Sequence, residues 1–151
     1  MARHSFSLLT RSVAVDPFTQ GLTLHDVAEG IVIGSPVPVP PLEGDGFHVV
    51  AGFDWVFVSL VSRSSNETPE QPVGRVTIVG PNDRPFDGPE FNLDLANGPS
   101  TRNFTKISNF PYVGDGTYRF QLQIQDADGW TIHGEHAVAV TLQHATEGLG
   151  V

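Results

Sequence analysis

The sequence predicts an all-β fold, an antiparallel β-sandwich of about eight or nine strands. Apolar and polar residues alternate with a period of two in several segments, as they do in strands with one buried face and one exposed face. Glycine and proline are abundant, at 16 and 12 of the 151 residues, which is typical of a chain with many turns. No window of about 11 residues carries apolar residues at a convincing helical spacing. The length fits one domain, residues 1–151.

The first third of the chain is expected to hold a hairpin and an extended segment. Residues 6–15 and 22–27 are the predicted strands, and residues 16–21 form the turn between them. At most one helical turn is expected, near residues 24–30. The proline-rich residues 35–41 are expected to be extended, in a polyproline-like conformation.

The most apolar segment, residues 49–61, is predicted to be a central strand. Apolar residues occupy both alternating sets of positions, which favours cover on both faces. Asp54 interrupts this segment, and an acid there must be paired, hydrogen-bonded or placed at an exposed strand end. We favour the strand end. The polar residues 62–72 that follow are predicted to form a mobile loop.

The C-terminal half contains the clearest alternation. Short strands are expected at residues 76–78, 91–95 and 104–110. In residues 117–125 the apolar face is Tyr118, Phe120, Leu122 and Ile124, and the glutamines face solvent. After a turn at residues 126–129, a hairpin partner at residues 130–143 places one set of side chains on its apolar face: Trp130, Ile132, Val138, Val140 and Leu142. Residues 145–151 are expected to form a flexible tail.

Two resemblances support the sandwich. The segment Gly114-Asp-Gly-Thr-Tyr-Arg-Phe120 resembles the turn before a late strand of immunoglobulin-like domains, in which a tyrosine hydroxyl binds the backbone at a corner. Tyr118 matches that tyrosine, but Gly114 stands where the family usually has an acid, and Asp115 is one position away. The resemblance implies an immunoglobulin-like sandwich.

Residues 8–24, with the hairpin Asp16-Pro-Phe-Thr-Gln-Gly-Leu-Thr-Leu24, resemble a family of small bacterial all-β proteins of unknown function. The chain departs from that family at Gln20, where glycine is favoured, and at Asp115, where proline is favoured. These motifs specify turns and strands. They therefore imply a fold and transfer no catalytic residue.

Charge and composition exclude several classes of function. The chain has 17 acidic and 8 basic residues, a net charge of −9, and its only lysine is Lys106. This balance argues against binding nucleic acid or an anionic membrane surface. The absence of cysteine excludes disulfides, thiolate metal sites and cysteine nucleophiles. No apolar leader and no apolar stretch of membrane-spanning length is present, so a cytoplasmic location is expected.

Three residues are candidates for a metal site: His133, Glu135 and His136. Positions i and i+3 of a regular strand point to opposite faces, so both histidines can reach one ion only if Gly134 forms a bulge. The structural alternative is that His136 lies on a partly buried strand face and His133 lies in solvent. No cofactor motif is present, and none is predicted.

The hairpin at residues 126–130 offers candidates for ligand binding. Asp126 and Asp128 match part of a calcium loop, although the remaining ligands of such a loop are absent. Trp130 stands at the mouth of the hairpin, where it can stack on a sugar ring. The structural alternatives are a simple hairpin turn and a packed tryptophan.

The function predicted from these observations is a non-enzymatic protein-interaction or assembly module. A homo-oligomer is expected, most simply a two-fold dimer formed through a strand edge or a sheet face, because few edge-blocking residues are present. One alternative is a domain that binds a small ligand or carbohydrate. A second is a metal-dependent enzyme.

Overall fold

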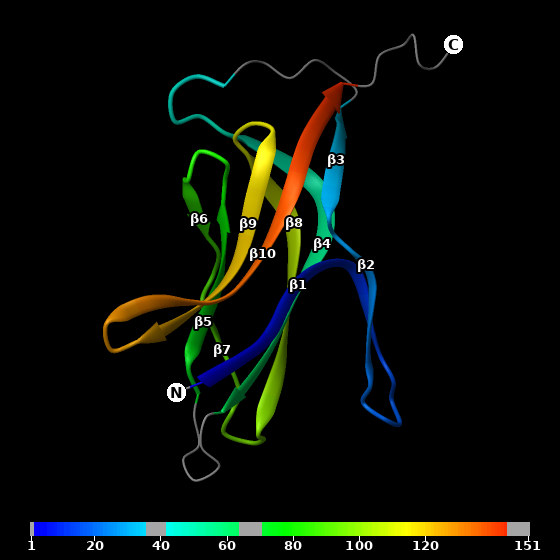
Figure 1. Ribbon diagram of the computed structural model, residues 1–151, viewed down its shortest axis with the longest axis vertical. Helices are drawn as coiled ribbons and strands as arrows, with labels where there is room; N and C mark the ends of the chain where they lie inside the picture. Colours follow the sequence, from blue (N-terminus) through cyan, green and yellow to red (C-terminus); the bar gives the residue numbers. More distant parts are fainter. Residues whose placement is uncertain (1, 36–41, 64–70, 145–151) are drawn as a thin grey trace.

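A computed structural model describes residues 2–35, 42–63 and 71–144 (Figure 1). These residues form ten strands and no helix. The expected count of eight or nine strands is too low, because two of the ten are very short, with three and two residues. The predicted helical turn near residues 24–30 is wrong, because that segment belongs to two strands with a short break between them. The strands are β1 (Ala2–Val15), β2 (Leu22–Val27), β3 (Gly30–Ser35), β4 (His48–Arg63), β5 (Val73–Val79), β6 (Pro85–Asp87), β7 (Phe91–Asn92), β8 (Ser100–Tyr112), β9 (Gly116–Asp126) and β10 (Gly129–His144).

The strands form two sheets, so the expected two-layered all-β architecture is confirmed. Sheet A has the order β2-β1-β4-β8, and sheet B has the order β3-β10-β9-β5-β6, with β7 paired to β5. Sheet B is not purely antiparallel, because β3 runs parallel to β10. The chain leaves sheet A after β2 and crosses to sheet B within two residues, where the buried Ala28 donates its N–H to the Leu9 carbonyl at 2.8 Å. This short crossing determines the direction of β3.

The core lies between the sheets and is centred on aromatic rings. Tyr118, Phe120, Leu122 and Ile124 of β9 are all buried, as the alternation predicts. Sheet A contributes Phe53, Phe57 and Phe110. The Phe110 ring lies 4.6 Å from the Phe53 ring and 4.7 Å from the Tyr118 ring, in stacked and tilted arrangements. These distances are typical of favourable aromatic pairs.

Tyr118 makes the hydrogen bonds to the backbone of the corner that the motif at residues 114–120 predicts. Its hydroxyl donates to the Gly114 carbonyl at 2.7 Å and accepts the Val113 N–H at 2.8 Å. Asp115, the displaced acid of the motif, accepts hydrogen bonds from the Tyr112 hydroxyl at 2.6 Å and from the Leu142 N–H at 2.8 Å. The turn between β8 and β9 is therefore tied to β10.

A bulge in β10 overturns part of the predicted apolar face. The register with β9 shifts between Ile132 and Gly134, so that His133 is an extra residue. The shift inverts the alternation of the residues that precede it. Ile132 is consequently 54% exposed instead of buried, and Trp130 lies on the outer face of sheet B against Arg75. The prediction that both residues share the core face of Val138 and its neighbours is wrong.

The strand β4 is central in sheet A, as predicted, but its faces are covered unequally. Phe57 and Val61 lie in the core, whereas Val58 is buried on the outer face between Leu8 and Phe104 of the neighbouring strands. Asp54 does not end the strand. It lies inside β4 at a bulge, with φ of +51°, where the strand bends and its carboxylate turns outward.

The start of the predicted loop at residues 62–72 belongs to a strand instead. Ser62 and Arg63 belong to β4, and residues 71–72 lead into β5. Residues 64–70, the predicted tail at 145–151 and most of the proline-rich segment lie outside the described residues.

Candidate functional site: the open side of the sandwich

The two sheets meet closely along one side, where β1 passes β10. The Leu9 N–H donates to Nδ1 of His136 at 2.8 Å, which joins sheet A to sheet B directly. The bulge in β10 brings Gly134 against His4 and Ser7, and a side chain at this position would collide with both of them. This side of the sandwich is therefore closed.

A chain of polar side chains stabilises the closed side. Nε2 of His4 lies 2.7 Å from Oγ of Ser7, which in turn lies 2.7 Å from Oγ of Ser59. Burial lowers the pKa of His4, of His133 and of His136 below the ordinary value. Ser7 and Ser59 are both buried, so this arrangement holds the sheets together and leaves the serine oxygens out of reach of a substrate.

The opposite side of the sandwich is open. The edge strand of sheet A there is β8, and sheet B ends at β6 and β7. Between them lies a cavity of about 470 Å³. Its walls are largely apolar, with Val76, Ile78, Phe86 and Phe91 from sheet B facing Ile107 and Phe110 from β8. This volume falls within the usual range of ligand-binding pockets.

The free edge of β8 runs along the mouth of this cavity. Within the described residues, β4 is the only strand that pairs with β8, so its other edge has unpaired N–H and C=O groups. Residues of β8 alternate between the two faces of the sheet: Thr105 and Ile107 point toward the cavity, and Phe104 and Lys106 lie on the outer face. Lys106 also borders the mouth of the cavity. Phe104 is 45% exposed and Lys106 is 68% exposed in its side chain.

A second hollow of about 760 Å³ lies on the outward side of the same strand. One wall is the arm of β1 that leads into the β1–β2 hairpin, and the other wall is formed by β4 and β8. Arg102 of β8 donates to the Gln20 carbonyl in the hairpin turn at 2.6 Å, which ties the hairpin to β8. Figure 1 shows this hairpin, in blue, projecting from the body of the sandwich. The strand β8 thus has a hollow on each side of its free edge.

The residues predicted to bind a ligand lie in the other sheet, at the β9–β10 hairpin, and are engaged in local contacts. The Asp126 carboxylate accepts the Thr131 hydroxyl at 2.6 Å and the Asp128 N–H at 2.9 Å. The Arg75 guanidinium covers the Trp130 ring at 4.2 Å. The two aspartates therefore shape the turn, and one face of the indole is already occupied.

The three predicted metal ligands point in different directions. Although β10 does bulge at the expected place, the Glu135 carboxylate accepts a hydrogen bond from Gln121 at 2.8 Å on the outer face of sheet B. The His136 ring instead accepts from Leu9 between the sheets. His133 lies close enough to His4 and Asp126 to interact with them electrostatically. Among the residues that the structure describes, no three histidine or acidic side chains are grouped to hold an ion.

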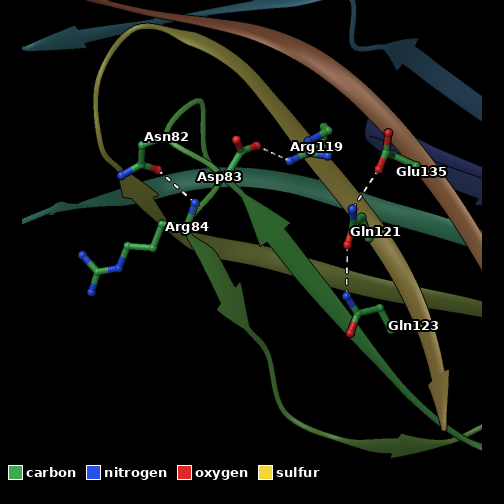
Figure 2. Close-up of polar contacts among 7 residues, drawn as sticks. All are labelled: Asn82, Asp83, Arg84, Arg119, Gln121, Gln123 and Glu135. Atoms are coloured by element: carbon green, nitrogen blue, oxygen red, sulfur yellow. Dashed lines mark hydrogen bonds and ion pairs between the residues drawn. The ribbon is translucent and has the colours of Figure 1, made fainter. Parts of the chain in front are cut away.

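A polar network on the outer face of sheet B was missed by the sequence argument (Figure 2). Gln121 is only 2% exposed, although the alternation predicted that it faces solvent. Its amide donates to Glu135, and its carbonyl accepts the Gln123 amide at 3.0 Å, as Figure 2 shows. The Arg75 Nε donates to Gln123 at 2.9 Å. Neighbouring strands supply the side chains that cover Gln121, and a period of two in one strand does not reveal them.

The position of β8 at the edge of sheet A also cannot be predicted from its residues, because no local pattern distinguishes an edge strand from a central one. The residue pattern predicts a strand at residues 104–110, but the partner on each side depends on the order of strands in the sheet. One indirect signal was available: Lys106, the only lysine, lies in this segment, and charged residues are common on strand edges.

No helix of the described residues is long and apolar enough to cross a membrane. Comparison of the chain with protein-family models and with curated proteins found no match.

Proposed function

We propose that this protein is a non-enzymatic interaction module that binds an extended segment of a partner protein at β8. The observation that carries the proposal is the position of the free β8 edge beside the apolar cavity. A segment that adds to this edge gains main-chain hydrogen bonds from β8 and places alternate side chains in the cavity.

The residues along the free edge of β8 favour binding of a particular segment over indiscriminate strand pairing. Arg102 and Lys106 lie along β8, and Pro111 near its end lacks an N–H. Charged residues and proline are common devices by which proteins prevent indiscriminate pairing at sheet edges. The edge is therefore open to a segment whose side chains suit these residues.

We further infer that the sandwich is immunoglobulin-like, on the basis of the Tyr118 corner. In sandwiches of this kind, the strand edges are common places for partner recognition by strand addition.

Hydrogen exchange on a selected peptide complex tests the proposed function. Peptides of about ten residues, enough to span a long strand, are selected from a displayed random library for binding to the purified protein. Backbone amides of β8 are expected to exchange more slowly in the complex, because the added strand occupies their free edge. Protection confined to another strand, or failure to select any binder, would overturn the proposal.

A cavity-filling variant sharpens this test. Thr105→Trp places an indole at the mouth of the cavity and is expected to weaken peptide binding at least about tenfold, since it removes space for the partner's side chains. The matched control is Thr117→Trp, at an exposed position of β9 in the other sheet. Equal loss of binding in both variants, with both folded by circular dichroism, would contradict the proposed site.

A further inference from the structure

We infer that the partner segment alternates, with apolar side chains on the face that enters the cavity and at least one acidic side chain on the opposite face. This inference rests on the proposed function and specifies the chemistry of its partner. It follows from the two faces of β8, since one borders the apolar cavity and the other carries cations.

The geometry of strand pairing determines which side chains meet. In a strand added to β8, successive residues point to opposite faces, and each lies about 4.5–5.5 Å from the β8 residue opposite it. One set of partner side chains therefore lies beside Thr105 and Ile107 and enters the cavity. The other set lies beside Phe104 and Lys106 on the outer face.

The cavity favours apolar side chains. Val76, Ile78 and Phe91 face the opening from sheet B, and a charged group placed among them would lose its hydration without a partner. Asp87 also lines the cavity, but its carboxylate accepts the Thr77 hydroxyl at 2.9 Å and lies 3.4 Å from the Arg75 guanidinium. The charge of Asp87 is therefore already compensated.

The outer face favours an acid. Two basic residues of β8 lie on this face: Arg102 holds the hairpin, and Lys106 stands on the edge strand. Of the described residues that line the outer hollow, Asp54 is the acid, and its carboxylate is 3.8 Å from the Lys106 ammonium, beyond hydrogen-bond distance. Lys106 thus retains donors for a partner carboxylate.

The same charges argue against pairing of β8 with β8 of a second copy. Such a pair would bring Arg102 and Lys106 of both copies onto one outer face. Like charges that lie opposite one another across a strand pair are destabilising. A different, acidic segment is therefore the occupant that this edge suits best, and the homo-oligomer expected from the sequence would have to use another surface.

Two designed peptides test this inference. Both are about ten residues long and alternate valine with threonine. In one peptide the two central threonines are replaced by glutamate, and in the other they are replaced by lysine. Affinities are measured by isothermal titration calorimetry at low ionic strength for the wild type, for Lys106→Glu and for a control, Arg3→Glu, which makes the same charge change at an exposed position on β1.

The wild type is expected to prefer the glutamate peptide about fivefold, the size of effect given by an exposed ion pair. Lys106→Glu should reverse this preference, and Arg3→Glu should preserve it. Equal affinity for both peptides, with slowed exchange still found along β8, would overturn the acidic preference and leave strand addition intact. If neither peptide slows exchange along β8, both the inference and the proposed function fail.

Discussion

At the scale of the residue, single contacts between β1 and β10 decide how the sheets join. Gly134 is the clearest example, because the bulge in β10 presses its backbone against His4 and Ser7. A glycine in a strand often marks such a close approach. Gly34 of β3 provides a contrast, because a side chain added there would meet nothing within 4 Å.

Gly134→Ala is expected to lower the free energy of unfolding by about 1–3 kcal/mol, because the added methyl group overlaps side chains that are already packed. Gly34→Ala should change the free energy of unfolding by less than about 0.5 kcal/mol, as is usual at open sites. Urea denaturation of both variants measures the difference. Equal midpoints for the two variants would show that the closed side tolerates a larger residue.

At the scale of the element, β9 shows how a strand with simple alternation can have two buried faces. Leu122 lies in the core and Gln121 lies in the polar network on the other face, whereas Gln125 near the strand end is exposed. Truncation of these three side chains therefore has different consequences. Truncation of Leu122 leaves an apolar cavity, and truncation of Gln121 leaves its polar partners unpaired. Truncation of Gln125 leaves neither.

Truncation along β9 should give three distinct losses of stability. Leu122→Ala is expected to cost about 2–5 kcal/mol, the usual range for a buried leucine. Gln121→Ala should cost about 1–3 kcal/mol, because the amides and carboxylate around it lose hydrogen-bond partners. Gln125→Ala should stay within about 0.5 kcal/mol. Denaturant unfolding gives the order, and a Gln121→Ala variant as stable as Gln125→Ala would contradict the buried network.

At the scale of the whole molecule, the sandwich is closed on one side and open on the other. The closed side depends on uncharged histidines, since Nδ1 of His136 can accept the Leu9 N–H only when that nitrogen has no proton. The open side depends on largely apolar walls, and none of the described residues that line its cavity is a histidine. Acidification should therefore weaken the closed side first.

The stability of the protein is expected to fall as the pH drops below about 6.5, the ordinary pKa of histidine. Burial lowers the pKa of His4, His133 and His136 in the folded state, so the unfolded state binds more protons in this range. Stability is thus fully present above that pH and is lost as the pH falls through the lowered pKa values.

Thermal unfolding measured between about pH 8 and pH 5 checks this expectation. In His136→Gln, the amide oxygen can accept the Leu9 N–H without titrating, so the loss should be smaller. The control His25→Gln, at an exposed position of β2, should follow the wild type. A wild-type melting temperature that stays constant over this range would disprove the role of the histidines.

The all-β class, the inward face of β9 and the tyrosine corner can be predicted from the residues alone, because alternation and turn residues act within a few positions of the chain. The parallel pairing of β3 with β10, the bulge of β10 at His133 and the cover over Gln121 are properties of the assembled sheets. So is the position of β8 as an edge strand beside a cavity. Each of these features depends on which distant strands become neighbours, and that choice leaves no period in the residues of any one strand.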